Sequence, residues 1–552
     1  MKNTVTLPLL SSVLVLAAHV ALSRPPAPAR AVEHAAATAP ATPAPTVPMA
    51  PAKRASAGID PESYPMIGDE ELGQLRHVLA IADQDPLDFK NLEGIDQLGM
   101  TSYRYAIAFM SYFLAVEQYY KLQAAPELIQ PRMDRLIQKM VQRPVWEYWA
   151  GVSRGLPNLE PKMNKPYPEE HDPVAHRNIM YSGHVGHMIG LYEMLFRDFK
   201  YDLPGAITFT WSPTEKYPYD HHSLCRVMRD QMANNPWHGI ECEPNAVFPE
   251  CNQHPVLSFI LHDQLHGSDL ASVNELFLDF FLKNKMIDPT THETAMLYLV
   301  KQQITLSSQN PRYKNALDLA IAPAVSLGII TLDSSAANGW TGAFMHAWQP
   351  DYIARHYPYQ RDNSLRDGGD SASLKMEWWE PTLKYGFFSL YAAEMGDAGT
   401  RDKLLRFADA QYGPVWRDGV FRYPYSQAKK CTNLTGHLLA IARALPANGL
   451  WTMHNKPLTE ADLAAPRLAG IDFPRVVLRR AVWDSGNKSL VFTTEPGGAK
   501  GGETKVRIIQ LDPATAYKIY RDGREVDSFQ LLAEREVAVP LDGRHSFVMA
   551  EE

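Results

Sequence analysis

A histidine and two cysteines, with a methionine one helical turn from the histidine, are the side chains of this sequence whose types and spacing best suit a proton-transfer site. Met180 and His184 are one helical turn apart in the tract Asn178-Ile-Met-Tyr-Ser-Gly-His184, so both are expected to face the same way. Gly183 and Gly186 are expected to leave open space beside them. Histidine is the side chain most often used as a general acid or base, so this tract is a candidate active-site helix.

Cys242 and Cys251 lie in the segments GIECEPN and FPECN. The proline in each segment forbids a continuous helix between the cysteines, so both sulfurs are expected on a loop. Cys251 comes just before a helix expected from Pro255 to His266, and a helix N-terminus would lower the pKa of its thiol. Two structural interpretations compete with catalysis. His184 could be a core histidine whose ring nitrogens are hydrogen-bonded, and the two cysteines could form a disulfide in an exported protein.

Two further motifs suggest other chemistry. His262-Asp-Gln-Leu-His266 has the spacing of a zinc-binding HExxH helix, but Asp replaces Glu and no third ligand is evident, so an ordinary helix is favoured. Glu377 and Glu380 flank two tryptophans and, with Asp370, would suit a glycosidase or polysaccharide lyase. The alternatives to an acid–base enzyme are therefore a glycan-processing α/α-barrel enzyme and a non-catalytic exported binding protein.

The elements that must position these residues are mainly helical up to about Leu445. Apolar residues recur at three- and four-residue steps, as in the helices expected from Ser102 to Tyr120 and from Asn178 to Phe196. After Trp451 short β-prone runs alternate with turn signals such as Asp522-Gly523. The expected fold is an (α/α)6 barrel followed by a small antiparallel β-sandwich.

The N-terminus predicts export. An apolar stretch follows Lys2, with cleavage expected near Ser23 or after Ala31; the alternative is an uncleaved membrane anchor. The expected organisation is a signal peptide at residues 1–23, a Pro/Ala-rich linker at 24–58, the helical barrel at 59–455 and the β domain at 470–552. The net charge of −8 without a basic stripe argues against a nucleic-acid partner. No stable membrane span is expected after signal cleavage.

The tracts NIMYSGHVGHMIGLY (178–192) and GIECEPNAVFPECNQHPVLSFILHDQLHG (239–267) resemble the linalool dehydratase/isomerase family. The tract SYRYAIAFMSYFLA (102–115) also fits, and the resemblance extends roughly from Glu70 to Leu445. It implies an exported (α/α)6-barrel enzyme that dehydrates a tertiary allylic monoterpene alcohol to a diene and isomerises it, without metal or organic cofactor. The expected partner is a small hydrophobic alcohol or alkene.

By this resemblance His184, Cys242, Cys251 and Asp88 fall on catalytic positions. The substrate-binding positions are Tyr105, Met180, Tyr181, Phe248 and Trp340. The family's aspartate comes from a neighbouring subunit, so a ring-like homo-oligomer is expected, with Asp88 pointing outward in an isolated chain.

The sequence departs from the family around that aspartate. Asp88 is not followed by the tyrosine that the family has at this place. Three other aspartates, Asp83, Asp85 and Asp96, compete for the same position, and Val247 stands where the family has an aromatic residue. The natural substrate, the reaction direction and the identity of the upstream acid are therefore left open.

Overall fold

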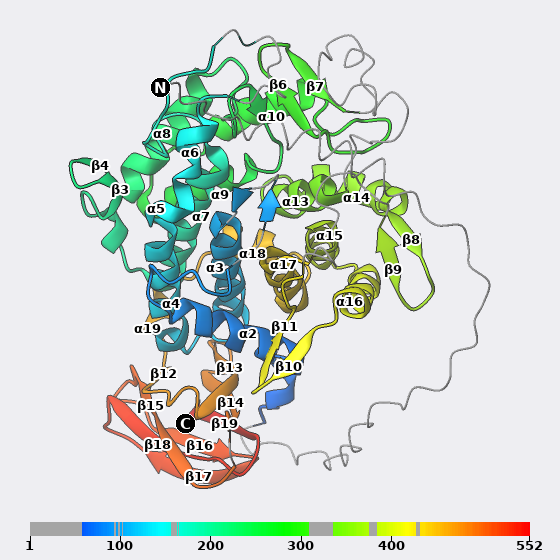
Figure 1. The fold of residues 1–552 in the computed structure, drawn as a ribbon. Helices are drawn as coiled ribbons and strands as arrows, with labels where there is room; N and C mark the ends of the chain where they lie inside the picture. Colours follow the sequence, from blue (N-terminus) through cyan, green and yellow to red (C-terminus); the bar gives the residue numbers. More distant parts are fainter. Residues whose placement is uncertain are drawn as a thin grey trace, which may run out of the picture. The chain divides into compact units, whose positions relative to one another are not determined.

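The structure, a computed structural model, describes residues 58–92, 95–97, 100–101, 103–155, 163, 165–307, 335–374, 383–426, 431–498 and 500–552. These residues belong to one compact unit (Figure 1). The expected signal peptide and nearly all of the linker lie outside them. Within these ranges no helix is both long enough and apolar enough to cross a membrane.

The described chain from residue 69 to residue 464 is largely helical, as the apolar periodicity predicts. The helices are α2 (Asp69–Ala82), α3 (Tyr103–Tyr120), α4 (Pro126–Met140), α5 (Arg143–Trp146), α6 (Tyr148–Val152), α7 (Ile179–Phe196), α8 (His221–Asn234), α9 (Gln253–His266), α10 (Val273–Lys283), α13 (Ser335–His346), α14 (Pro350–Ser364), α15 (Leu383–Glu394), α16 (Ala398–Tyr412), α17 (Asn433–Ala444), α18 (Gly449–Asn455) and α19 (Glu460–Ala464). Short 3-10 helices are η1 (Pro61–Ser63) and η2 (Lys200–Asp202).

Small antiparallel sheets interrupt the helices, and the sequence did not predict them. Their strands are β1 (Ile95–Gln97), β2 (Met100–Thr101), β3 (Ile207–Ser212), β4 (Glu215–Tyr219), β5 (Ala246–Val247), β6 (Leu297–Leu299), β7 (Ile304–Leu306), β8 (Leu365–Asp367), β9 (Ala372–Leu374), β10 (Val415–Arg417) and β11 (Val420–Arg422). Most are two- or three-residue strands, too short for a period-2 pattern to stand out from loop sequence.

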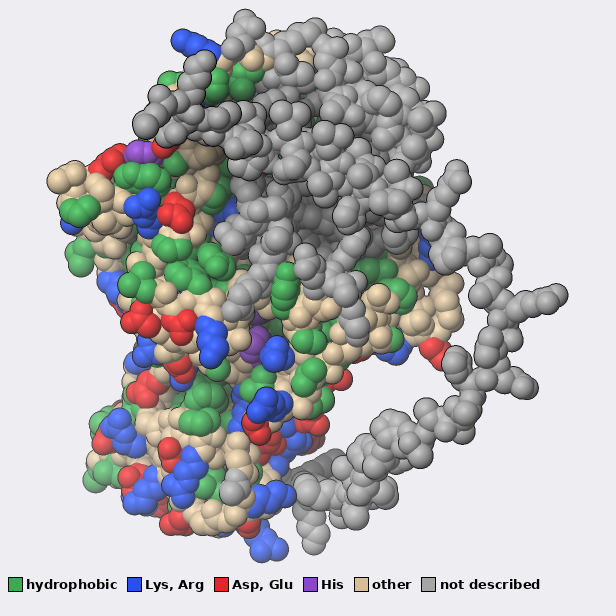
Figure 2. All heavy atoms as spheres, viewed as in Figure 1, with side chains coloured by type: hydrophobic (Ala, Val, Ile, Leu, Met, Phe, Trp, Pro, Cys, Tyr) green, Lys and Arg blue, Asp and Glu red, His purple; other side chains and the backbone are tan. Residues whose placement is uncertain are grey.

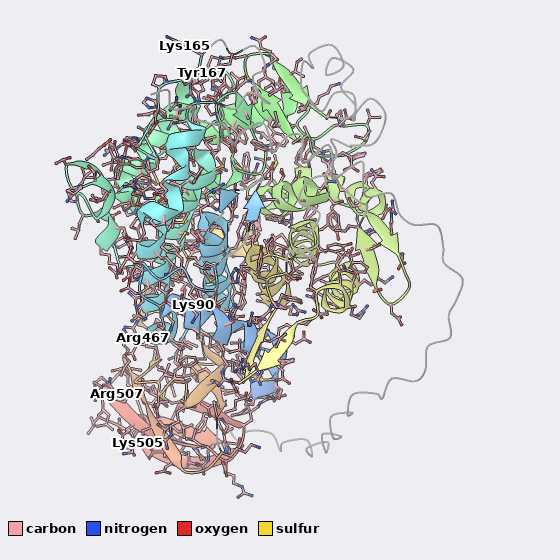
Figure 3. The ribbon with its side chains drawn as sticks, in the orientation of Figure 1. Lys90, Lys165, Tyr167, Arg467, Lys505 and Arg507 are labelled. Atoms are coloured by element: carbon pink, nitrogen blue, oxygen red, sulfur yellow. The ribbon has the colours of Figure 1, made fainter. Side chains whose placement is uncertain are left out.

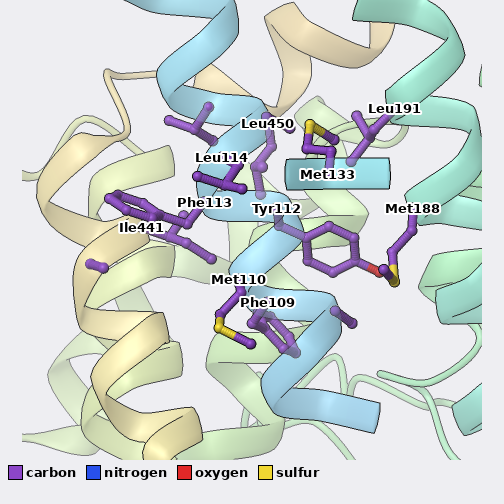
Figure 4. Close-up of a cluster of buried hydrophobic side chains, with 14 of the residues drawn as sticks. Phe109, Met110, Tyr112, Phe113, Leu114, Met133, Met188, Leu191, Ile441 and Leu450 are labelled. Atoms are coloured by element: carbon purple, nitrogen blue, oxygen red, sulfur yellow. The ribbon is translucent and has the colours of Figure 1, made fainter. Parts of the chain in front are cut away.

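The helical core is built around α3 and α7. Both are apolar around most of their circumference, which predicts a buried rather than a surface helix, and α7 is buried from Ile179 to Leu195. Figure 4 shows Phe113 and Met110 of α3 among side chains from neighbouring helices, including Ile441 of α17. Of the residues described below, α3 carries Arg104, Tyr105 and Tyr112, and α7 carries Met180, His184 and His187.

Glycines on α7 allow α9 to approach closely. A Cβ at Gly183 would lie 2.9 Å from Pro255 Cδ, and one at Gly186 would lie 2.7 Å from Ser258 Oγ. The expectation of open space beside Met180 and His184 is thus wrong, because α9 fills that space. The close packing places the helix that follows Cys251 directly against the helix that carries His184.

The C-terminal region contains two antiparallel sheets, with strand orders β12-β15-β18 and β13-β14-β19-β16-β17. Cross-strand ion pairs join β15 to β18, where Lys505 pairs with Glu536 and Arg507 with Glu534 (Figure 3). The strands are β12 (Arg467–Ala469), β13 (Val476–Asp484), β14 (Ser489–Pro496), β15 (Glu503–Ile509), β16 (Tyr517–Arg521), β17 (Arg524–Phe529), β18 (Glu534–Pro540) and β19 (His545–Glu551).

Backbone hydrogen bonds join these sheets to the connection between α3 and α4. The Ala481 N–H donates to Lys121 O (2.7 Å), the Ala124 N–H donates to Ala481 O (2.8 Å), and the Leu468 N–H donates to Ala124 O (2.7 Å). On the described part of the face in Figure 2, basic and acidic side chains are interspersed rather than segregated. The domain limits at residues 455 and 470 stay a prediction.

Candidate functional site

The start of α7 is hydrogen-bonded to the segment that carries the cysteines, residues 239–252, here called the thiol loop. The Asn178 N–H donates to Cys242 O (3.2 Å), and the Ile179 N–H donates to Glu241 O (3.3 Å). Asn178 has a φ of 55°, a left-handed conformation that asparagine tolerates. The first turn of α7, with Met180, is therefore fixed beside Cys242.

The ends of the thiol loop are tied together by one asparagine. The Ile240 N–H donates to Asn252 Oδ1 (2.8 Å), and Asn252 Nδ2 donates back to Ile240 O (3.0 Å). Cys242 and Cys251 are free, buried thiols that hydrogen-bond to each other. The loop thus brings together two sulfurs that are separated along the chain.

Both thiols are held in the protonated form. Burial raises the pKa of Cys251 above its usual value and raises that of Cys242 further, since the Cys251 contact adds to it. The N-terminus of α9 was expected to lower the pKa of the Cys251 thiol. That expectation is wrong in direction, because desolvation of the thiolate outweighs the effect of the helix dipole. Near neutral pH the pair offers protons rather than a thiolate.

Two buried glutamates flank the thiols. Burial raises the pKa of Glu250 to about 8 and also raises the pKa of Glu243, with Glu250 further affected by the charge of Glu243. Sequence reasoning did not select either residue, although both lie inside the cysteine segments. A carboxyl group beside a cysteine in a proline-containing loop is ordinarily solvated, so only the fold reveals its burial.

Arg104 is a buried cation at the edge of this group. Its guanidinium lies 4.4 Å from the ring centre of Tyr105 and 4.1 Å from that of Tyr148, and donates to the Met180 sulfur (3.5 Å). Electrostatic interactions with Tyr148, Tyr105 and Glu243 raise its pKa despite burial. We call the following set the thiol site: Arg104, Tyr105, Tyr148, Met180, Cys242, Glu243, Glu250 and Cys251.

His184 is fully buried next to the thiol site. Its Nδ1 lies 2.8 Å from the Tyr112 hydroxyl, and its Nε2 has no hydrogen-bond partner among the described residues. Burial, with smaller contributions from His187 and Arg104, lowers the pKa of His184 well below 6.5. The imidazole is therefore neutral at neutral pH. With Tyr112 as donor to Nδ1, Nε2 would carry the ring proton; the other tautomer leaves Nε2 as an acceptor.

A chain of buried histidines continues from this point. The His254 ring centre lies 3.9 Å from that of His184, and His254 Nδ1 lies 3.1 Å from His187 Nδ1. His187 Nε2 lies 2.7 Å from His454 Nε2, and His454 Nδ1 lies 2.7 Å from Leu450 O. Burial lowers the pKa of each of these three histidines. Tyr112, His184, His254, His187 and His454 form the histidine chain.

Aromatic rings join the histidine chain to the thiol site. Tyr105 lies edge-on to His184 (ring centres 5.5 Å apart) and to Trp340 (5.6 Å), and interacts electrostatically with both cysteines. Trp340 donates from Nε1 to His254 Nε2 (2.9 Å). The predicted residues Tyr105, Met180, His184, Cys242, Cys251 and Trp340 therefore lie in one connected group.

The remaining predicted residues lie differently. Phe248 is half-buried in the thiol loop. Tyr181 donates its hydroxyl to Met140 O (2.8 Å), a packing contact with α4. Asp88 is exposed, and its carboxylate accepts from the Lys90 N–H (2.9 Å). The structure thus leaves Asp88 outside the thiol site of its own chain.

Of the three carboxylates in the glycan alternative, the structure describes one. Asp370 is exposed in the β8–β9 hairpin, and Glu377 and Glu380 lie outside the described residues. Among the residues that sequence reasoning missed, Arg104, Tyr112 and His254 fall within the motif tracts, whereas Tyr148 and His454 carry no local signal.

A family model described as linalool dehydratase/isomerase matches residues 104–326 and 325–429. Similar solved structures include an alpha-1,6-mannanase of Salegentibacter sp. HEL1_6, with 12% identity over 68% of this chain and 99% of that chain and a TM-score of 0.39. Another is an alpha-mannanase of Bacteroides thetaiotaomicron, with 10% identity, 70% and 98% coverage and a TM-score of 0.39. A third is Dfg5 of Chaetomium thermophilum in complex with glucosamine, with 12% identity, 72% and 96% coverage and a TM-score of 0.36.

Proposed function

This chain belongs to the linalool dehydratase/isomerase family, and from that membership and the thiol site we propose that it is a cofactor-independent lyase or isomerase acting on a small alkenol. The observation that carries the proposal is the position of Tyr105, whose ring lies edge-on to His184 and which interacts electrostatically with the two thiols. A proton donor and a neutral imidazole then flank one aromatic ring, which suits a substrate that must gain and lose protons at different atoms.

The proposed reaction balances with the thiol pair as proton donor and His184 as proton acceptor. A thiol of the Cys242–Cys251 pair donates its proton to the hydroxyl oxygen, and the carbon–oxygen bond breaks with its electron pair leaving as water. His184 Nε2 accepts a proton from a neighbouring carbon, and that C–H pair becomes the new double bond. The imidazolium then returns the proton to the thiolate. For isomerisation the C–H bond stays intact: a water molecule forms a bond to the other end of the allyl system as the first carbon–oxygen bond breaks and the double bond shifts, and the added water then gives its proton to the thiolate.

Arg104 sets a condition on this chemistry. A buried guanidinium in contact with the Met180 sulfur disfavours a full positive charge on a substrate bound there. The proton gain at oxygen and the proton loss at carbon are therefore proposed to be concerted, which limits the charge that develops. The rings of Tyr105 and Tyr148 cover the guanidinium, and the electrostatic interaction with Glu243 offsets part of its charge.

Finer features of the family are proposed with this function. The helices are proposed to close an (α/α)6 barrel and the C-terminal sheets to form a β-sandwich. The chain is proposed to be exported and to assemble as a ring-like homo-oligomer, in which the exposed Asp88 reaches a neighbouring thiol site.

The test is turnover of a tertiary allylic monoterpene alcohol under reducing, oxygen-free conditions, with diene and isomer measured by gas chromatography. Cys251→Ala and His184→Ala are expected to reduce turnover by about 100-fold or more while the circular dichroism spectrum stays native. The matched control is Cys431→Ala, which removes a buried thiol elsewhere in the core and should stay active. Full turnover in Cys251→Ala, or in protein whose thiol pair has been oxidised, would refute the proposal.

A further inference from the structure

A second group of ionisable residues, two buried and two partly exposed, lies where α7, α8 and α9 pack together (Figure 1). Glu193 comes from α7, Asp202 ends η2, His221 begins α8, and His266 ends α9. None of the four belongs to the thiol site or the histidine chain. We call this set the histidine–carboxylate cluster.

The ligand atoms of the cluster surround a small space. His221 Nδ1 lies 2.8 Å from Glu193 Oε2 and 3.8 Å from Asp202 Oδ1. His266 Nε2 lies 3.2 Å from the same Glu193 oxygen, and its Nδ1 lies 3.9 Å from Asp202 Oδ2. One atom from each of the four residues can be chosen so that all lie within 4.8 Å of one another.

These separations suit a bound metal ion. Nitrogen and oxygen ligands about 2.1 Å from a tetrahedral Zn²⁺ lie about 3.4 Å from one another. The measured separations fall on both sides of that value, and each imidazole would offer one of its nitrogens, so side-chain rotations would give all four residues a common centre. Imidazole nitrogens with carboxylate oxygens are a donor set that Zn²⁺ accepts.

Unsatisfied polar atoms in the cluster also point to a ligand. Glu193 has no exposed side-chain surface, yet its Oε1 lacks a hydrogen-bond partner among the described residues. Asp202 Oδ1 is likewise buried and without a hydrogen bond. Buried polar atoms are nearly always paired, so two such carboxylate oxygens in one cluster need an explanation.

Two more histidines support the cluster from outside. His262 Nε2 lies 2.8 Å from His222 Nδ1, and His262 Nδ1 lies 2.7 Å from Ser268 Oγ. His221, His262 and His266 form a second group whose ligand atoms lie within 4.8 Å of one another. The fold therefore brings further ligands to His262-Asp-Gln-Leu-His266, a motif for which the sequence alone shows no third ligand.

We propose that Glu193, Asp202, His221 and His266 bind one divalent first-row transition metal ion, with Zn²⁺ the best fit. Its role is structural. Glu193 follows His184 by nine residues on α7, which is about 13 Å along the helix axis, too far for the ion to touch a substrate at the thiol site. The ion joins the end of α7 to the end of α9, and so braces the two helices that hold His184 and His254.

The experiment uses untagged full-length protein freed of metal by a chelator. Zn²⁺ is added in competition with a chromophoric zinc indicator, and bound metal is counted by mass spectrometry. One Zn²⁺ per chain and a higher melting temperature are expected. Asp202→Asn and His266→Gln should each weaken binding at least about tenfold. Both side chains are partly exposed, at 17% and 15%, so their variants are expected to fold; His176→Ala, at an exposed histidine, is the control.

Because the thiol pair could also take Zn²⁺, Co²⁺ separates the two sites. A nitrogen–oxygen site gives visible Co²⁺ bands without a near-ultraviolet thiolate charge-transfer band, and Cys242→Ala should leave those bands intact. The proposal is overturned if folded wild-type protein binds no more Zn²⁺ than His266→Gln, if the variants keep wild-type affinity, or if the thiolate band accompanies the bound Co²⁺. None of these outcomes depends on catalytic turnover.

Discussion

Replacing Glu250 by glutamine should change how the stability of the protein depends on pH. Glu250 is buried beside Cys251, and its Oε2 has no hydrogen-bond partner among the described residues. Burial, followed by the charge of Glu243, raises its pKa to about 8. The folded protein therefore keeps a proton on Glu250 at a pH where an unfolded chain has lost it.

The sign and size of the effect follow from that difference. The unfolded chain releases the proton near pH 4.5 and the folded chain near pH 8, so the free energy of unfolding falls by about 1.4 kcal/mol per pH unit between them. The stability contribution is fully present below pH 4.5 and is lost as the pH rises through about 8. Over the whole interval the loss amounts to about 5 kcal/mol.

Urea unfolding, followed by tryptophan fluorescence at several pH values from 4 to 9, measures this. Glutamine cannot ionise, so the difference in unfolding free energy, Glu250→Gln minus wild type, should rise with pH and level off above about 8. Glu147→Gln, at an exposed glutamate on the surface of the same helical region, should give a flat difference. A flat difference for Glu250→Gln would refute the assignment of a buried, protonated carboxyl group.

Three other predictions concern the thiols, the helix packing and the assembly. The Cys251 thiol should react with iodoacetamide at pH 7.5 at least about tenfold more slowly than free cysteine, because burial raises its pKa and blocks access; mass spectrometry gives the rate. Gly342→Ala should cost about 1–3 kcal/mol in thermal unfolding, because its Cβ would lie 2.4 Å from the Tyr391 ring, whereas Gly151→Ala, with nothing within 4 Å, should not show this packing cost. Asp88→Asn should change stability by less than about 0.5 kcal/mol, since Asp88 is exposed. A loss of turnover in that variant, with light scattering showing an oligomer, would place the carboxylate at a neighbouring subunit's site; unchanged turnover would exclude such a role.

The sequence predicts the positioning helices well. The expected helix from Asn178 to Phe196 is observed as Ile179–Phe196, and the one expected from Pro255 is observed as Gln253–His266. Both are long and have clear boundaries, with a left-handed Gly267 ending the second. Periodicity and caps are local properties, so they can be read from local sequence.

Long-range electrostatics could not be predicted in the same way. The helix that follows Cys251 suggests a lowered thiol pKa, but the direction depends on burial, which comes from α7 and the rest of the fold. Nothing in the sequence around Arg104 marks it as buried. One of the two rings that enclose it belongs to Tyr148, which is 44 residues further along the chain. The histidine–carboxylate cluster likewise joins four separate elements.

Burial changes the protonation of the thiol site in a way that fits an uncharged substrate. In water near pH 7 a glutamate is ionised and a histidine is partly protonated. Here Glu250 holds its proton to about pH 8, the thiols keep theirs, and His184 is neutral. Arg104 remains charged, and the electrostatic interaction with Glu243 offsets part of that charge. Neutral donors and acceptors let a buried alcohol bind without adding charge to an apolar interior, and the thiolate and imidazolium formed during the reaction have opposite charges. A charged substrate would add its own desolvation cost.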